Sequence, residues 1–254
     1  MSKRVEQLLA EHAEVTRRWF VKAGIAGTTA AAAWPLFGAE ATRSPDLEAA
    51  IARLESYFTL PDDFRDVSRG SPKPHTLPED KKRAVGLTRD TWKLELTSDP
   101  ENPARLTKEL SVGFRDLMEL ADRRAVRFAK VMTCLNIGCP LGMGIWEGVP
   151  LRDVLWQTGP KEDLRRVFYY GYHNDDPKQL FRSSLPVGRI LEDLYDLPPV
   201  ILCYKLNGQW LTPERGGPVR VIVPESYGFK SVKWLTNVVL SNVSHANDLR
   251  GGQQ

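Results

Sequence analysis

The sequence contains few of the residues that usually carry metal or nucleophile chemistry. Its 254 residues include only three cysteines and four histidines. Cys134 and Cys139 are separated by four residues, a spacing that fits neither zinc ribbons nor redox dithiols, and no histidine follows at a ligand spacing. There is also no G-x-S-x-G nucleophile elbow. The sequence therefore does not indicate a structural zinc site, a dithiol oxidoreductase or a serine hydrolase of that type.

The chain also lacks a block of charge of either sign. Its 35 basic and 32 acidic residues are interspersed and give a formal net charge of +3. Because nucleic-acid binding depends on clustered basic groups, this pattern gives it little support. With 42% hydrophobic and 26% charged residues, the composition is that of a globular protein large enough for one sizeable core.

No apolar run reaches the usual length of a membrane span, but the N-terminal region carries a targeting pattern. Arg17 and Arg18 precede aromatic and apolar residues, and a weakly apolar stretch over 23–37 is followed by the small residues of Ala39-Glu40-Ala41. This resembles a twin-arginine export signal over 1–41. It predicts a periplasmic protein folded before export, often with a cofactor inserted. An uncleaved signal that anchors the protein to the membrane is the alternative.

Periodicity and turn residues predict mixed α and β structure without regular βαβ alternation, which is typical of an α+β fold. Asn207-Gly208 is a strong hairpin signal, with the returning strand at Trp210-Leu211. Residues 135–144 are too rich in glycine to continue a strand. We expect a signal over 1–41, an N-terminal helix and extended segment over 42–90, and one domain over 91–254. The predicted strands are 92–96, 127–133, 167–170, 200–206, 219–223 and 238–240, and the predicted helices are 46–58, 114–121, 149–157 and 183–194.

Cys134 follows the predicted strand 127–133, so a reactive side chain would be held at the end of a rigid element. An odd number of cysteines in an exported protein leaves one thiol that needs a reason to stay unpaired, and metal ligation is such a reason. Cys203 lies in an apolar run and reads as a buried small hydrophobe. The role of Cys139 is left open: it is a spare thiol, a disulfide partner or a residue near the site.

The stretch 216–234 is the other informative part of the sequence. Arg220 lies inside an apolar strand and must therefore find an anionic or hydrogen-bonding partner. The loop 227–233 then offers two lysines, a serine hydroxyl and backbone donors. Such a loop can bind a phosphate or a polar ring edge, and the alternative is a surface loop with solvated lysines.

These stretches together resemble a known family. T-C-L-N at 133–136, W-E-G-V-P-L-R-D-V-L at 146–155 and G-G-P-V-R-V-I-V-P-x-x-Y-G-F-K-S-V-K-W at 216–234 are similar to the molybdopterin-binding domain of the sulfite oxidase family. Within that family the likeness is greatest to the bacterial periplasmic methionine sulfoxide reductase catalytic subunits. The resemblance implies a mixed-sheet molybdopterin-binding domain of the sulfite oxidase type, with molybdenum as its metal.

The resemblance also assigns residues. It implies that the Cys134 thiolate binds molybdenum, a soft ligand suited to such a centre, and is the catalytic residue. It implies that Arg220 contacts the cofactor and that Ser231, Val232 and Lys233 hold the pterin and its phosphate.

Some positions depart from the family pattern. Arg215 stands where the methionine sulfoxide reductases carry a cofactor-binding asparagine, and Gly171 stands near their threonine. Arg69 precedes Pro72 and Pro74 where sulfite oxidases carry an arginine-asparagine-histidine run, and is expected to substitute as a phosphate ligand.

The implied function is an exported molybdopterin-dependent oxidoreductase that transfers an oxygen atom to or from a small oxo-compound, by sulfoxide reduction or sulfite-type oxidation. The implied electron partner is a membrane haem or quinone protein or a cytochrome, and the protein is expected to be a monomer. Trp146, Tyr227 and His173 are candidates for the pocket wall or for ordinary packing. The alternative is a non-catalytic cofactor-binding or partner module of an exported redox system.

Overall fold

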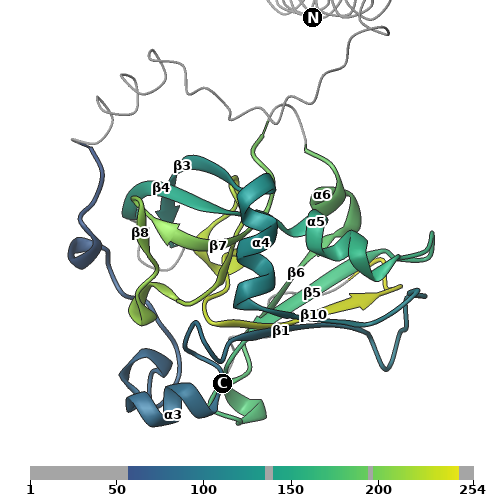
Figure 1. The fold of residues 1–254 in the computed structure, drawn as a ribbon, viewed down its shortest axis with the longest axis horizontal. Coiled ribbons are helices and arrows are strands. Elements are labelled where there is room, and N and C mark those ends of the chain that lie inside the picture. Colours follow the sequence, from purple (N-terminus) through teal and green to yellow (C-terminus); the bar gives the residue numbers. More distant parts are fainter. Residues whose placement is uncertain (1–56, 135–139, 194–196, 246–254) are drawn as a thin grey trace, which may run out of the picture. The chain divides into compact units, whose positions relative to one another are not determined.

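The computed structural model describes residues 57–134, 140–193 and 197–245, which belong to one compact unit that begins at Leu54 (Figure 1). The predicted export signal, almost all of the predicted helix 46–58, and Cys139 lie outside the described residues.

Five strands form the first sheet, in the order β2-β1-β10-β5-β6. The parallel pair is β1 with β10, which places Leu96 opposite Val238, and the other pairs are antiparallel. Three of these strands confirm the runs predicted at 92–96, 167–170 and 238–240. The strands are β1 (Lys93–Ser98), β2 (Leu110–Gly113), β5 (Arg166–Gly171), β6 (Arg182–Pro186) and β10 (Leu235–Ser241).

The second sheet has the order β3-β4-β7-β8, and β9 pairs with the far end of β7. All of its pairs are antiparallel. The predicted hairpin is present, because Asn207 and Gly208 take the positive φ values of 51° and 76° that a tight β-turn needs. The strands are β3 (Val126–Thr133), β4 (Pro140–Pro150), β7 (Ile201–Leu206), β8 (Gln209–Trp210) and β9 (Arg220–Ile222).

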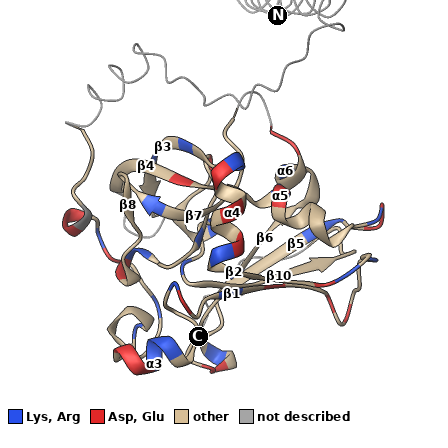
Figure 2. Cartoon of the chain, viewed as in Figure 1, with Lys and Arg blue, Asp and Glu red and all other residues tan. Residues whose placement is uncertain are grey.

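The described helices are short. Helix α4 (Phe114–Arg124) confirms the predicted helix 114–121 and begins where the Asp116 carboxylate accepts a hydrogen bond from the Gly113 amide at 2.8 Å. It packs against β4 (Figure 1). Figure 2 shows basic and acidic residues interspersed along the described chain. Among the described residues, every helix is too short or too polar to cross a membrane. The other α-helices are α3 (Glu79–Ala84), α5 (Leu151–Leu155) and α6 (Val187–Leu191).

The second sheet separates two hydrophobic clusters, because alternate residues of its strands point to opposite faces. Leu202, Tyr204 and Val221 join the larger cluster, which also contains residues of the first sheet such as Leu96 and Leu240. The smaller cluster covers the opposite face and consists of Phe64, Met132, Leu141, Trp146, Ile201, Cys203, Leu206, Leu211 and Ile222. The fold is thus α+β, as predicted, and each face of the second sheet is distinct.

Two sequence predictions are wrong. Residues 182–186 form β6, and helix α6 begins only at Val187, because Ser183, Ser184 and Leu185 are buried as the edge strand beside β5. Residues 140–144 are not irregular but begin β4. Proline is tolerated as the first residue of a strand. Gly142 sits under the ring of Phe64, so its missing side chain allows a close packing contact.

Candidate active site

Cys134 directly follows β3, as predicted, and packs against the smaller cluster while remaining partly exposed. Cys203, on β7, is fully buried, its thiol donates to the Lys205 carbonyl at 3.2 Å, and burial raises the pKa of the thiol to about 12. The prediction that Cys203 is a buried core residue is confirmed. Of the two described cysteines, Cys134 is therefore the one that can offer a thiolate to a metal.

Arg220 lies on the same face of the second sheet, opposite Cys203 in the pairing of β9 with β7. Its Nη1 donates to the Arg215 carbonyl at 2.8 Å and its Nη2 to the Ser231 carbonyl at 2.6 Å. Its guanidinium lies 5.3 Å from the ring centroid of Trp146. Burial lowers the pKa of Arg220 to about 10, so the side chain remains charged at neutral pH.

The third nitrogen of Arg220, Nε, is the most informative about a ligand. The Nε atom is buried and has no hydrogen-bond partner within the described structure. Buried donors are almost always satisfied, so an unpaired N–H on a charged group indicates a missing acceptor. The geometry suits a polar or anionic ligand on this face of the sheet.

The loop 227–233 is fixed by its own backbone and by contacts to the first sheet. The Ser231 hydroxyl accepts a hydrogen bond from the Val223 amide at 3.2 Å, and the Val232 carbonyl accepts one from the Val221 amide at 3.0 Å. Tyr169 donates its hydroxyl to the Lys230 carbonyl at 2.9 Å. The two predicted cofactor residues Ser231 and Val232 are thus buried parts of a rigid loop.

The same loop reaches Cys134. A Cβ atom added to Gly228 would lie 2.8 Å from the Thr133 carbonyl oxygen and 3.4 Å from the Met132 sulfur. Only a glycine allows this approach, so the loop backbone lies directly against the residue that precedes Cys134. The structure therefore brings together the two stretches that the sequence singled out.

Lys233 extends to a different set of groups. Its ammonium donates to Asp66 Oδ1 at 3.2 Å, to the Ser68 hydroxyl at 2.6 Å and to the Glu214 carbonyl at 2.7 Å. Burial, with the nearby charge of Arg220, lowers the pKa of Lys233 to about 8 even though Asp66 opposes this change.

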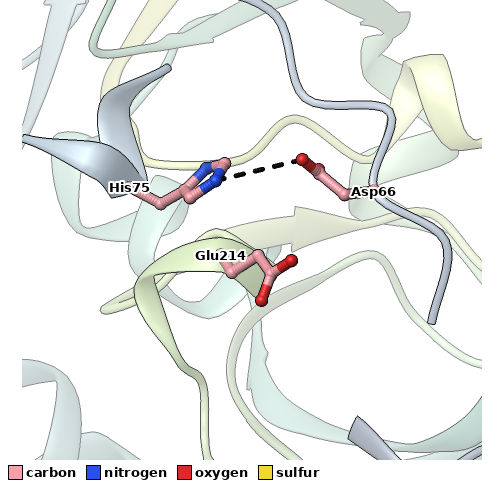
Figure 3. A group of neighbouring side chains, drawn as sticks. All are labelled: Asp66, His75 and Glu214. Carbon is pink, nitrogen blue, oxygen red and sulfur yellow. Dashed lines mark ion pairs between the residues drawn. The ribbon is translucent and has the colours of Figure 1, made fainter. Parts of the chain in front are cut away.

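Asp66 collects several donors. Lys73 Nζ lies 2.9 Å from its Oδ2, and the amide and hydroxyl of Ser68 both donate to Oδ1. Burial alone would raise the pKa of Asp66, but the hydrogen bonds from Ser68 and Lys73 and the charge of Lys233 hold it well below its usual range. Figure 3 shows Asp66 facing His75, whose Nε2 lies 3.9 Å from Oδ2, with Glu214 on a separate segment beside them.

The structure places the two remaining predicted cofactor residues differently. Arg215 is buried beside the site: its carbonyl accepts from Arg220, and its guanidinium lies 5.6 Å from the ring centroid of Phe64. Arg69 is exposed, and its guanidinium lies 5.0 Å from the ring centroid of Phe181. The residue before it, Ser68, accepts a hydrogen bond from Lys233 through its hydroxyl at 2.6 Å.

Comparison with known proteins identifies the family. Residues 84–248, more than half of the chain, match the oxidoreductase molybdopterin binding domain. The chain belongs to this family. The chain is 29% identical over 214 residues to mitochondrial sulfite oxidase of Drosophila melanogaster, covering 80% of this chain and 35% of that protein. It is 39% identical over 99 residues to sulfite oxidase of Gallus gallus, covering 38% of this chain and 21% of that protein.

Other relatives extend the comparison. The chain is 33% identical over 115 residues to nitrate reductase [NADH] of Volvox carteri, covering 43% of this chain and 13% of that protein. It thus spans about a third or less of these three curated relatives. The sulfane dehydrogenase SoxCD of Paracoccus pantotrophus has a similar fold, with a TM-score of 0.52 and 19% identity over 82% of this chain and 57% of that chain.

The predicted family, fold and cofactor are therefore confirmed: this is a molybdopterin-binding oxidoreductase domain of the sulfite oxidase type, with molybdenum as its metal. The residues fit that cofactor in part. The partly exposed Cys134 thiol is a soft ligand, and the unpaired Arg220 Nε offers a buried donor. Lys233 does not offer a spare donor, because a lysine has three N–H groups and three protein acceptors already surround its ammonium.

Sequence reasoning missed Asp66, Ser68, His75 and Glu214. They come from two segments far apart in the chain, 66–75 and the turn that carries Glu214, and none shows a motif spacing that could have joined them. His75 stacks on Trp234, with ring centroids 6.1 Å apart. Within the described residues, ligand atoms of Asp66, His75 and Glu214 lie within 4.8 Å of one another, a grouping that could hold a metal ion. The ammonium groups of Lys73 and Lys233 on Asp66 repel a metal cation and so oppose its binding there.

The candidates for the pocket wall differ in exposure. Trp146 is only 1% exposed and donates its indole N–H to the Lys130 carbonyl at 3.2 Å, so it packs beneath Arg220 and does not line an open pocket. His173 lies edge-on to Tyr170, with ring centroids 6.4 Å apart. Tyr227 is 48% exposed and precedes Gly228, which lies against Thr133. Tyr227 is the candidate whose surroundings allow contact with a substrate.

Proposed function

We propose that this chain is the catalytic molybdenum subunit of an exported redox system, and that it transfers an oxygen atom to or from a small oxo-compound. The observation that carries the proposal is the joint placement of Cys134 and Arg220. Both lie on one face of the second sheet, the first as a partly exposed thiol and the second as a buried guanidinium with an unpaired N–H.

Each residue has a role that follows from its position. The Cys134 thiolate would hold the metal from the rigid end of β3. Arg220 would direct its free N–H to the pterin, while its other two nitrogens tie Arg215 to Ser231. Ser231 and Val232 keep the loop backbone in place. When bound, the molybdenum centre supplies two-electron oxygen-atom chemistry.

We favour sulfoxide reduction, because the motifs 133–136, 146–155 and 216–234 resemble those of the periplasmic methionine sulfoxide reductases. In that reaction a sulfoxide takes up two electrons and two protons and gives a sulfide and water. The sulfite oxidases among the relatives support the reverse direction of oxygen transfer, oxidation of sulfite, as the second candidate. Tyr227 would contact the substrate in either case.

The location and the electron partner are proposed from the sequence. Arg17-Arg18 and the weakly apolar stretch that follows support export to the periplasm in a folded, cofactor-loaded state; an uncleaved signal that anchors the protein to the membrane is the alternative. A membrane haem or quinone protein, or a cytochrome, would exchange the two electrons with the monomeric catalytic subunit.

The test removes one thiol at a time. The Cys134→Ala variant should lose nearly all turnover and retain less molybdenum when the protein is made in a host that synthesises the cofactor. Cys203→Ala is the matched control, because it removes a thiol from the same face of the sheet but from a fully buried position. Metal analysis and two assays, viologen-linked reduction of methionine sulfoxide and ferricyanide-linked oxidation of sulfite, measure the outcome. Full turnover in Cys134→Ala would refute the proposed role of Cys134, and molybdenum without turnover in the unaltered protein would favour a non-catalytic module.

A further inference from the structure

The phosphate-binding role that the family resemblance gives to Lys233 conflicts with its contacts. Its ammonium is surrounded by Asp66 Oδ1, the Ser68 hydroxyl and the Glu214 carbonyl at 2.6 to 3.2 Å. A lysine ammonium has three N–H groups, so a phosphate oxygen can be bound only if one of these acceptors leaves.

Asp66 is bound in the way that proteins bind a phosphate. Its carboxylate accepts from the Ser68 hydroxyl, from the Ser68 amide at 2.9 Å, and from the ammonium groups of Lys73 and Lys233 at 2.9 and 3.2 Å. A hydroxyl, a backbone N–H and two cations are common phosphate ligands. Asp66 therefore occupies an oxyanion site with its own carboxylate.

Charge decides which acceptor must leave Lys233. The Ser68 hydroxyl and the Glu214 carbonyl are neutral and can remain beside a phosphate. A carboxylate and a phosphate dianion within a few ångströms of each other repel strongly in a partly buried site. Asp66 is thus the one charged acceptor on Lys233, and the one that a phosphate would displace.

We infer that the Asp66 carboxylate occupies the site where the phosphate of the cofactor binds. Binding of the cofactor then displaces Asp66 from Lys233. The inference rests on the proposed function, because it requires that the chain bind molybdopterin. It makes Asp66 a competitor: its carboxylate keeps Lys73 and Lys233 together before loading, and its displacement lowers the net affinity for the cofactor.

Two other roles for Asp66 predict different results. If Asp66 oriented Lys233 in the loaded protein, removing its charge would weaken cofactor binding. If Asp66, His75 and Glu214 formed a metal site (Figure 3), the protein would bind a divalent cation. The competitor role predicts tighter binding of the cofactor on removal of the charge.

The experiment uses the full chain made without cofactor and titrated with molybdopterin cofactor, with binding followed by pterin fluorescence. We expect Asp66→Asn to lower the dissociation constant about tenfold, an effect of about 1.4 kcal/mol. Asp63→Asn is the matched control, because it removes the same charge from an exposed position in the same segment and should leave the constant unchanged. In a protein that already carries Lys233→Met, the further change Asp66→Asn should leave the dissociation constant unchanged, since the competition acts through the Lys233 ammonium.

The outcomes separate the inference from the proposed function. Weaker or unchanged binding in a folded Asp66→Asn variant would overturn the inference alone. If that variant does not fold, Asp66→Ser replaces it, with the same expected direction. Tight binding of Mn²⁺ by the unaltered protein, lost in Asp66→Asn and in His75→Ala, would overturn it in favour of a metal site. No cofactor binding by the unaltered protein would refute the proposed function itself.

Discussion

Arg220 is buried and Lys233 is partly buried in the cofactor stretch, and the two residues are prepared for a ligand in opposite ways. Arg220 uses two nitrogens to bridge the carbonyls of Arg215 and Ser231 and keeps its Nε unpaired. Lys233 already has a protein acceptor for each of its three N–H groups. The first residue can receive a ligand without rearrangement, whereas the second must exchange a partner.

The pKa of Lys233 gives a prediction about pH. Burial holds this pKa at about 8, and the titratable groups that act on the ammonium are Asp66, Arg215, Arg220 and His75. A phosphate dianion stabilises the charged lysine and so raises its pKa in the complex. Cofactor affinity should therefore be nearly constant up to about pH 7 and fall roughly tenfold between pH 7 and 9, because the free protein loses a proton that the complex keeps.

Fluorescence titration of the cofactor across this pH range measures the effect. Burial also holds the pKa of Lys130 at about 8, so that residue is the necessary control. In Lys130→Met, cofactor affinity should still decline between pH 7 and 9. Lys233→Met should bind the cofactor weakly, with an affinity that does not change over this pH range. A decline that persists in Lys233→Met would assign the titration to another group.

Gly171 shows what single residues in the sequence do and do not reveal. The sequence placed it near a threonine of the methionine sulfoxide reductases but gave no cause for the difference. A Cβ atom at this position would lie 2.1 Å from the Lys233 carbonyl oxygen and 2.5 Å from that of Trp234. The departure therefore reflects the close approach of the backbone that carries Lys233, a contact over 62 residues of chain that local patterns do not encode.

At the scale of elements, the loop after β9 is held from two sides. Lys130 Nζ donates to the carbonyls of Pro224 and Ser226 at 2.8 and 2.7 Å. Arg189, from α6, forms two hydrogen bonds with the Glu225 carboxylate at 2.8 and 2.7 Å. These contacts fix the start of the loop, and its next residues lie against the end of β3. The position of Cys134 relative to the loop thus depends on how closely the backbone at Gly228 approaches the backbone at Thr133.

Gly228→Ala tests that approach. The added methyl group would meet the Thr133 carbonyl at 2.8 Å and should push the loop away from the strand that carries Cys134. We expect turnover and molybdenum retention to fall about tenfold or more, with a loss of about 1–3 kcal/mol in the free energy of unfolding. Metal analysis, the sulfoxide assay and denaturant unfolding measure these quantities.

Gly188→Ala is the control, because a Cβ added at Gly188 in α6 meets no atom within 4 Å. It should keep full activity and be at least as stable, since alanine favours a helix over glycine. Wild-type turnover in Gly228→Ala would show that the contact with Thr133 is not needed for the site.

The sequence predicted the elements whose signals are local. Alternating apolar residues predicted β1, the apolar run 200–206 predicted β7, and Asn207-Gly208 predicted the hairpin between β7 and β8. It failed where distant packing overrides local preference, as in the edge strand at 182–186. For the site, the motifs predicted Cys134 and Arg220 near one loop. The oxyanion cluster around Asp66 could not be predicted, because its members come from segments more than 130 residues apart.

At the scale of the whole molecule, the two faces of the second sheet have different roles: one packs in the main hydrophobic core, and the other carries the candidate site. The larger cluster lies between the sheets and contains fully buried residues of both, such as Leu202 and Leu240. The smaller cluster carries Ile222 and Cys203 on the face that also presents Arg220 and Cys134. Packing defects on the two sides should therefore have different consequences for the cofactor.

A pair of substitutions tests this division. Leu240→Ala and Ile222→Ala each remove a fully buried aliphatic side chain, and each should cost about 2–5 kcal/mol of the free energy of unfolding. At 25 °C only Ile222→Ala should weaken cofactor binding, because its cavity opens beside Arg220 on the same strand. Denaturant unfolding with and without cofactor measures both effects, since the stabilisation by a ligand grows with its concentration relative to the dissociation constant. An equal increment of stabilisation by cofactor in the two variants would show that the site does not depend on the smaller cluster.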